Sequence, residues 1–206
     1  METRVGLRGY RTQDPARMRA RRTEIMHAMA EVIAEKGYSA ATLEDVAARM
    51  GASRAVIYYQ FRSKEELYVE LLVEAGDRAT RRLREIIARG DSIDVTLKAA
   101  LRDLLEVGTL PVNRATLATG YPRQLSREAR QRVRDADRSY EDLLQSLVQQ
   151  GMDQGVFAQR DAKLVTMTLI HGTNTSFLWR RPDGRLPLEY FLEELPAMLL
   201  NGVLAR

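Results

Sequence analysis

The stretch of residues 42–67 constrains the fold of this chain more than any other part of its sequence. Thr42 and Asp45 have the spacing of a capping box, so a helix is predicted to begin there. This helix must be short, because Gly51 follows nine residues after Thr42 and favours a tight turn. Ser53 can then cap a second short helix. Two short helices joined by a tight turn are the pattern of a helix-turn-helix motif.

Helical patterns also precede and follow this stretch. Ser63 and Glu66 form a second capping-box pattern, and Ser126 and Asp161 are further candidate N-caps. Between such caps, glycines and prolines, apolar residues recur at helical spacing, which predicts helices near 15–36, 64–88, 92–107, 112–119, 126–154, 161–181 and 187–204. Since no stretch alternates apolar and polar residues as a strand would, the sequence predicts an all-α fold.

The composition excludes several classes of protein. No run approaches the about 18 apolar residues of a membrane span, and no apolar segment follows the arginine-rich N-terminus as in a secretory signal. The chain has no cysteine and two histidines, which leaves no thiolate ligand and little material for a metal or serine–histidine enzyme. We therefore expect a cytoplasmic protein without a membrane partner that is not an enzyme, with no catalytic residues, no metal site and no cofactor.

Positive charge is concentrated toward the N-terminus. Residues 1–64 hold twelve Lys and Arg against seven Asp and Glu, whereas the remainder is nearly neutral and the whole chain carries a net charge of +4. A basic segment joined to a neutral body indicates a polyanion partner, although a charge run can also be an ordinary solvated surface. Residues 1–13 lack helical periodicity and are predicted to form a flexible basic arm.

The second short helix carries residue types that suit contact with DNA. Ile57 and Phe61 occupy its inward positions, so the residues around them face outward. Arg54 can bond the O6 and N7 atoms of a guanine, and apolar side chains beside it can touch a thymine methyl. Neighbouring polar groups can donate to phosphates, which gives a predicted DNA-binding set of Thr42, Ser53, Arg54, Ala55, Val56, Tyr58, Tyr59, Gln60 and Lys64.

Two features of this region leave alternatives open. Adjacent tyrosines such as Tyr58 and Tyr59 are often half-buried packing residues at a helix end. The basic arm can be a passive tail, or this region can add phosphate or minor-groove contacts through its arginines: Arg8, Arg11, Arg17, Arg19, Arg21 and Arg22.

The motif positions between residues 24 and 71 follow a known pattern. A T-x-x-x-I-A opening, a G-V-S turn, an aromatic recognition helix and an F-x-x-K-E-x-L exit are matched by Thr42, Val46, Ala47, Gly51, Ser53, Tyr58, Phe61, Lys64, Glu65 and Leu67. The segment thereby resembles the DNA-binding domain of the TetR family of bacterial transcriptional repressors. It departs from the family at Ala52, Ala55 and Gln60, where valine, glycine and histidine are common.

The resemblance implies an architecture and a mode of action. It implies a basic arm at residues 1–13, a helix-turn-helix DNA-binding domain at 14–62 and a helical effector-binding and dimerisation domain at 63–206. A homodimer would place its recognition helices in two half-sites of a near-palindromic operator, roughly 34–36 Å or a multiple apart. An effector would shift the dimer toward spacings that do not fit the operator.

The C-terminal part of the chain suggests what the effector is. Trp179, Arg181, Pro182, Gly184 and Leu186 are similar to the W-x-R-P-x-G-x-L ending of a family branch that senses acyl-CoA or steroid-derived thioesters. This similarity implies a bulky, hydrophobic or acyl-CoA-like effector.

Polar groups on one helical face, among apolar residues, predict where that effector binds. The candidate pocket consists of Tyr121, Arg123, Tyr140, Leu144, His171, Asn174, Thr175, Phe177 and Trp179. A lone histidine is more often satisfied within a core, and Trp179 can equally be a structural plug.

The last two predicted helices carry apolar residues on more than one face. One intrachain neighbour cannot cover all of this surface, so we expect the two helices to pair with the same helices of a second copy. The sequence thus predicts a ligand-released, dimeric DNA-binding repressor. A helical protein–protein adaptor without sequence-specific DNA binding is the alternative, and an enzyme built on groups such as His171 has less support.

Overall fold

The structure is a computed structural model that describes residues 15–109, 113, 122–180 and 184–204. All regular elements in these ranges are helices, apart from one isolated β-bridge between Phe157 and Leu204, so the predicted all-α fold is confirmed. The helices are α1 (Pro15–Ala40), α2 (Leu43–Arg49), α3 (Arg54–Gln60), α4 (Lys64–Ile87), α5 (Ile93–Gly108), α7 (Arg127–Asp153), α8 (Ala162–Asn174), α9 (Ser176–Trp179) and α10 (Leu188–Asn201). Within these ranges, none of the helices combines the length and apolar character that crossing a bilayer requires.

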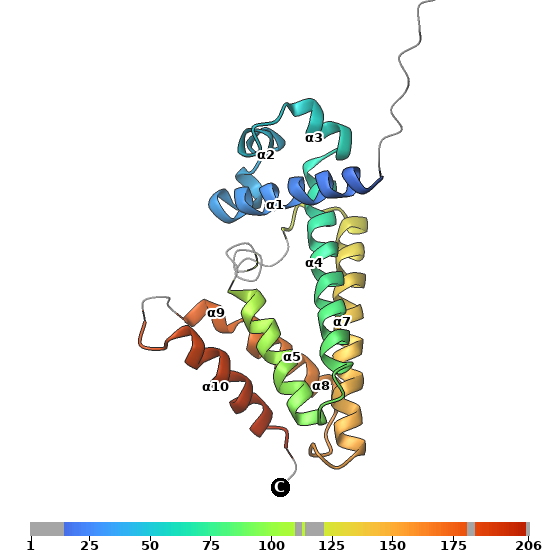
Figure 1. Ribbon diagram of the computed structural model, residues 1–206, viewed down its shortest axis with the longest axis vertical. Helices are drawn as coiled ribbons and strands as arrows, with labels where there is room; N and C mark the ends of the chain where they lie inside the picture. Colours follow the sequence, from blue (N-terminus) through green and yellow to red (C-terminus); the bar gives the residue numbers. More distant parts are fainter. Residues whose placement is uncertain (1–14, 110–112, 114–121, 181–183, 205–206) are drawn as a thin grey trace, which may run out of the picture.

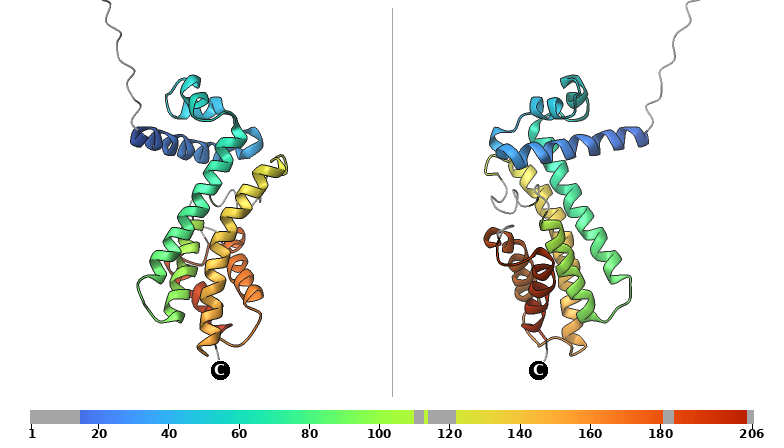
Figure 2. Two further views of the ribbon diagram at one scale, coloured as in Figure 1. Left: turned by 90° about the vertical axis from the view of Figure 1, so that its right-hand side faces the viewer. Right: turned by 60° about the vertical axis from the view of Figure 1, so that its left-hand side comes forward.

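The helices divide into a small unit and a larger body (Figure 1). Helices α1, α2 and α3 form the unit at one end, which we call the reading end. Helices α4 and α7 run side by side through the length of the body, and α5, α8 and α10 cover the half of it distant from the reading end (Figure 2). The C-terminal end of α10 lies on the side of the body opposite α3 (Figure 1).

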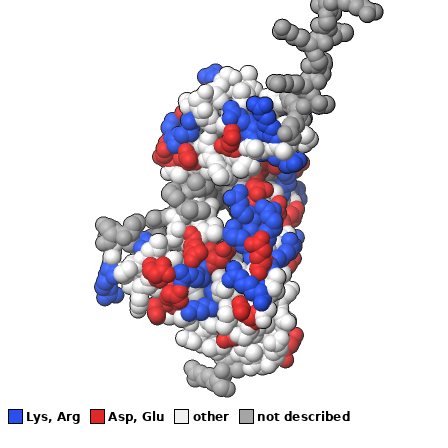
Figure 3. Space-filling view, in the orientation of Figure 1, with Lys and Arg blue, Asp and Glu red and all other residues white. Residues whose placement is uncertain are grey.

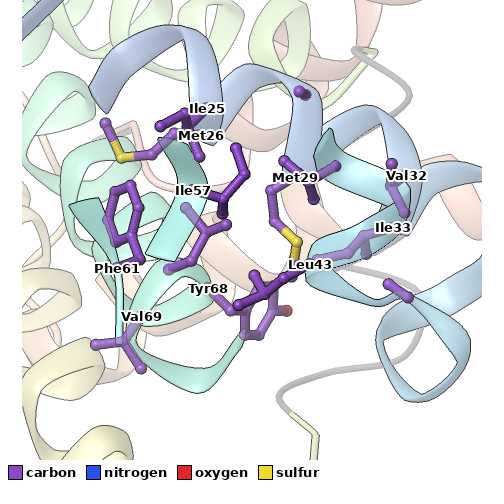
Figure 4. Packing of buried hydrophobic residues seen from close by; sticks show 14 of the residues in the cluster. Ile25, Met26, Met29, Val32, Ile33, Leu43, Ile57, Phe61, Tyr68 and Val69 are labelled. Carbon is purple, nitrogen blue, oxygen red and sulfur yellow. The ribbon is translucent and has the colours of Figure 1, made fainter. Parts of the chain in front are cut away.

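The reading end has its own apolar core. Ile25 and Met29 of α1 and Ile57 of α3 are fully buried in one cluster (Figure 4), and Val46 of α2 is fully buried in the same cluster. Tyr68 of α4 is also buried in this cluster. The side chains of α4 therefore belong to two cores, since Leu83, near the other end of the helix, is buried in the core of the body.

Four of the predicted N-caps form, whereas Ser53 stands at the N-cap position of α3 without a side-chain cap hydrogen bond. The hydroxyls of Thr42 and Ser63 accept hydrogen bonds from backbone N–H groups three residues ahead, and Ser126 and Asp161 cap α7 and α8 in the same way. The Ser63 box is not closed as predicted, because the Glu66 carboxylate accepts from the backbone N–H of Arg62 instead, at 2.7 Å. The caps were predictable because they depend on residues close in sequence.

The helix predicted at 161–181 is two helices, α8 and α9, that break at Thr175. The Thr175 hydroxyl donates to the carbonyl of His171 at 2.6 Å, and the Ser176 hydroxyl donates to that of Thr173 at 2.5 Å. Such bonds compete with the continuing helical ladder. The predicted arm at 1–13 and all but one residue of the helix predicted at 112–119 lie outside the described residues.

Candidate functional site

Helix α3 presents one buried and one exposed face. Ile57 and Phe61, predicted to face inward, are buried and point toward α1 (Figure 4). Tyr58 is 51% exposed and Tyr59 64% exposed, so neither tyrosine belongs to the apolar core and both offer surface to solvent. Because α3 lies at the extremity of the molecule, its exposed face is open to a large partner (Figure 1).

The first turn of α3 holds the residues predicted to read bases. Ser53, Arg54 and Ala55 are exposed, whereas Val56 is half-buried. The Arg54 guanidinium lies 3.5 Å from the carboxylate of Glu44, on α2, in a pair that is largely open to solvent. Exposed pairs of this kind contribute little free energy, so Arg54 is available to exchange Glu44 for another acceptor.

The turn between α2 and α3 fixes the direction of α3. Gly51 has a φ of +58°, a left-handed conformation that glycine adopts at little cost. The backbone N–H of Gly51 donates to the carbonyl of Ala48 at 3.1 Å, and that of Ala52 donates to the carbonyl of Ala47 at 3.0 Å. These bonds close the turn in the way that the helix-turn-helix pattern predicts.

Thr42 is committed to the start of α2. Its hydroxyl accepts from the backbone N–H of Asp45 at 3.1 Å and donates to the Asp45 carboxylate at 2.8 Å. The hydrogen bonds from Lys36 and Thr42 hold the pKa of Asp45 below its ordinary value. The structure thus places Thr42 as the cap of α2, with its hydroxyl proton already used.

Lys64 has a different role from the predicted phosphate contact. Its ammonium group donates to the carbonyl oxygens of Tyr38, Ser39 and Ala41, at 2.9, 3.3 and 2.9 Å, and lies 4.6 Å from the centre of the Tyr38 ring. An ammonium group has three N–H donors, and these three bonds use all of them. Lys64 therefore joins the start of α4 to the C-terminal end of α1 and the residue that follows it, and has no donor left for DNA.

Arg22 is likewise committed within the protein. Its guanidinium donates to the carbonyl of Gln60, the last residue of α3, at 2.7 Å and lies 4.2 Å from the centre of the Phe61 ring. It also lies 3.8 Å from the carboxylate of Glu70, which pairs with Arg132 at 2.7 Å. Arg22 thus connects the C-terminal end of α3 to α4, and through Glu70 to α7. The expectation that Arg22 reaches a phosphate is not supported by these contacts.

The predicted effector pocket is not assembled as expected. Tyr140 and Leu144 are buried in the core of the body, where burial and the nearby carboxylate of Asp103 raise the pKa of Tyr140. The described residues Arg123, His171, Thr175 and Trp179 are exposed, and Asn174 is half-buried. Tyr121 lies outside the described residues, as does the side chain of Phe177. The described members of this set therefore lie in two different environments and not around one cavity.

A cleft of about 720 Å³ lies instead between the reading end and the body, bounded by α1, α2, α4 and α5. Sequence reasoning missed it, because its walls come from helices distant in sequence. A signal was present on α4, where Leu71, Ala75, Arg78 and Arg82 recur every three or four residues. That face combines apolar, small and cationic residues.

An exposed α3 behind a tight α2–α3 turn, joined to a helical body, defines the class of helix-turn-helix DNA-binding regulators. Two family models match the sequence: bacterial regulatory proteins of the tetR family over residues 25–71, and the tetracyclin repressor-like C-terminal domain over residues 91–203. The chain belongs to the TetR family, and the predicted family is confirmed. It is accordingly a DNA-binding transcriptional regulator.

Similar proteins support this assignment over nearly the whole chain. The structure of a TetR/AcrR-family transcriptional regulator from Thermobifida fusca is 31% identical, with a TM-score of 0.71, over 89% of this chain and 98% of that one. The ketosteroid transcriptional regulator KstR2 of Mycobacterium tuberculosis is 25% identical, with a TM-score of 0.74, over 90% of this chain and 96% of that one. The fatty acid metabolism regulator protein of Bacillus subtilis is 23% identical over 87% of this chain and 94% of its own length.

Proposed function

We propose that the protein is a dimeric repressor that binds a near-palindromic operator through α3 and leaves it when a bulky apolar effector binds. The exposed face of α3 is the observation that carries this proposal. Tyr58 and Tyr59 are exposed beside Arg54, while Ile57 and Phe61 hold the helix to α1. Exposed aromatic residues next to a weakly paired arginine suit a surface that a polyanion covers.

The residues of α3 divide into two roles in this proposal. Arg54 bonds a guanine, and Ala55 and Val56 contact a thymine methyl, because the first turn of a recognition helix meets base edges in the major groove. The other groups contact the DNA backbone, namely Ser53, Tyr58, Tyr59 and Gln60. Thr42 and Lys64 support the motif by capping α2 and holding α1.

Dimerisation is proposed through α8 and α10. Leu164 of α8 is 66% exposed and Met198 of α10 is 67% exposed, and Leu188 and Tyr190 add further exposed apolar surface on α10. Apolar surface of this extent favours burial against the same two helices of a second copy, in a four-helix bundle. The dimer would hold two copies of α3 at a fixed distance.

The class of effector is proposed from the relatives. One is named for ketosteroids and another for fatty acid metabolism, so both names refer to large apolar compounds. We extend this preference for a hydrophobic or acyl-CoA-like effector to the present chain.

Selection of bound duplexes from a random pool, followed by affinity measurements on single variants, tests the DNA-binding part. We expect a near-palindromic sequence to be enriched. Arg54→Ala should weaken binding by about 1–3 kcal/mol and relax preference at one base pair of each half-site, whereas Tyr58→Phe should weaken binding to all sequences alike.

Arg160→Ala is the matched control. Arg160 is an exposed arginine in the connection between α7 and α8. That connection lies at the end of the molecule opposite α3 (Figure 1). This variant should bind as the parent does. If no sequence is enriched, or if Arg54→Ala and Arg160→Ala behave alike, the chain is better described as a helical adaptor and the proposal fails.

A further inference from the structure

The reading end carries acidic as well as basic side chains, although a surface that binds DNA faces phosphates. On the face shown in Figure 3, acidic and basic side chains lie beside one another on this part of the molecule. Glu31 and Glu35 of α1 both pair with Arg49 of α2. Glu44 of α2 differs from these acids, because its partner is Arg54, the first residue of α3.

The start of α2 places Glu44 beside α3. Thr42 caps α2, so the helix begins at Leu43 and Glu44 occupies its second position. Leu43 and Val46, three residues apart, are buried, which leaves Glu44 on the flank of the helix with 38% of its side chain exposed. Its Oε1 lies 3.5 Å from Nη1 of Arg54. The ion pair therefore joins the starts of two helices whose relative direction is fixed by the turn between them.

The guanidinium of Arg54 has more donors than Glu44 requires. A guanidinium carries five N–H groups, and a guanine takes two of them, at its O6 and N7 atoms. The Arg54 side chain is 70% exposed, and its guanidinium makes no hydrogen bond within the described part of the chain. Arg54 can therefore donate to a guanine while its remaining N–H groups still face the carboxylate of Glu44.

The charge of Glu44 distinguishes a base from a phosphate. The edge of a guanine is neutral, so a carboxylate beside Arg54 does not repel it. A phosphate bound to the same guanidinium would lie close to Glu44, and two anions at short distance repel each other. Salt does not remove this repulsion within a Debye length, which is about 10 Å at 0.1 M. Glu44 thus favours the contact that carries sequence information over the contact that does not.

An acid in the first turn of a helix also has a structural role. Negative charge near the N-terminus of α2 interacts favourably with the helix dipole, and Asp45 already closes the capping box there. Such a role affects the stability of α2 and leaves base preference unchanged. The ion pair across the turn to Arg54 is the feature that the helix dipole does not require.

We propose that Glu44 is a positioning residue for operator recognition, which keeps the Arg54 guanidinium on a base edge and disfavours its contact with phosphates. The inference rests on the proposed function, because it requires that Arg54 bonds a guanine. Glu44 itself touches no base in this arrangement. It acts only through Arg54, and it raises the discrimination between base pairs.

Binding measurements on a series of four duplexes test the proposal. One is the selected operator, and the others replace, in both half-sites, the base pair at which Arg54→Ala relaxes the preference. Discrimination is the affinity for the preferred pair divided by the mean affinity for the other three, at one salt concentration. Glu44→Gln should lower it by about threefold or more, since exposed ion pairs have modest free energies. Unchanged discrimination would overturn the proposal.

Glu35→Gln is the matched control. It removes one carboxylate from the reading end, as Glu44→Gln does, but the partner of Glu35 is Arg49 and not a residue of α3. We expect this variant to change the affinity for all four duplexes by a common factor. If it lowered the discrimination as much as Glu44→Gln does, the net charge of the reading end would account for the effect and the proposal would fail.

A double variant shows whether Glu44 acts through Arg54. Once Arg54 is replaced by alanine, adding Glu44→Gln should leave the base preference unchanged across the operator. A further loss of preference would mean that Glu44 contacts a base directly, which contradicts the proposed role. Thermal unfolding followed by circular dichroism completes the comparison. A lower melting temperature of Glu44→Gln together with parental discrimination would assign Glu44 to the stability of α2 alone.

Operator selection separates this inference from the proposed function. If no operator is selected, the repressor proposal fails, and the role of Glu44 fails with it. If Arg54→Ala relaxes one base pair of a selected operator but Glu44→Gln does not, only the role of Glu44 is wrong. If Arg54→Ala relaxes no base pair, the roles of Arg54 and Glu44 are both wrong while operator binding stands.

Discussion

Lys64 and Arg22 show how individual cations of the reading end are used. Both belong to a basic segment, and both bond backbone carbonyls: Lys64 those at the C-terminal end of α1 and just beyond it, Arg22 that of Gln60. Carbonyls near helix ends lack intrahelical partners and attract cations. The inward positions of Ile57 and Phe61 could be predicted because helical periodicity sets them. The partners of Lys64 and Arg22 could not, since they lie more than twenty residues away in sequence.

Lys64→Met should lower the free energy of unfolding by about 1–3 kcal/mol, because it leaves the partly buried carbonyls of Tyr38 and Ala41, and the exposed one of Ser39, without their charged donor. Urea denaturation measures this loss. Lys163→Met, at an exposed lysine 3.5 Å from Glu141, is the control and should change the free energy by no more than about 0.5 kcal/mol. If the Lys64→Met variant were as stable as the parent but bound DNA more weakly, the role of Lys64 would be the phosphate contact predicted from the sequence.

At the scale of elements, helix starts followed the local sequence where a side-chain cap set them, whereas α1, predicted to end near residue 36, extends to Ala40 across a kink at Gly37. Helix α4 begins directly after Ser63, and α7 directly after Ser126, as their capping patterns predicted. The break between α8 and α9 was missed, because Thr175 and Ser176 interrupt the helix with side-chain hydrogen bonds, and the neighbouring Gly172 lies within α8 and does not mark the break. Polar side chains of this kind are compatible with helix interiors as well as with breaks.

Close packing gives the same substitution opposite effects on two helices. The Phe157 ring lies against Gly151 of α7, and a Cβ atom added there would overlap the ring. At Gly172 of α8, an added Cβ would meet Leu199 at an ordinary 3.5 Å. Gly151→Ala should therefore destabilise the protein by about 1–3 kcal/mol, whereas Gly172→Ala should stabilise it by up to about 1 kcal/mol through helix propensity.

Urea denaturation of both glycine variants at one protein concentration measures the difference. The parent protein in the same series sets the reference. If both variants were stabilised, the ring of Phe157 would not be held against α7 in solution.

At the scale of the whole molecule, the sequence predicted a DNA-binding part and a helical body, but it did not predict the cleft between them. The effector pocket predicted around Tyr140 and His171 relied on residues that share a helix face or an apolar pattern. Folding placed Tyr140 in a filled core and His171 on the surface. The cleft, by contrast, depends on where α1 crosses α4, and that crossing is set by tertiary contacts such as those of Tyr68.

The proposed dimer makes a prediction at this scale. A double variant, Leu164→Glu with Met198→Glu, should give a monomer by light scattering and weaken operator binding, because charged groups at an apolar interface are costly to bury. Val95→Glu is the control, since Val95 is 49% exposed on α5, outside the proposed interface. That variant should stay dimeric. A double variant that remains dimeric would place the interface on another surface.

The contacts of Arg22 with Gln60, Phe61 and Glu70 attach α3 to the N-terminal part of α4. Helix α4 has 24 residues and is thus about 36 Å long. If a rigid helix of that length pivots by ~5° about its C-terminal end, its N-terminal end moves by ~3 Å, which is about one base-pair step. Angular precision in the packing of α4 and α7 would then decide whether two recognition helices stay in register with successive grooves of the double helix.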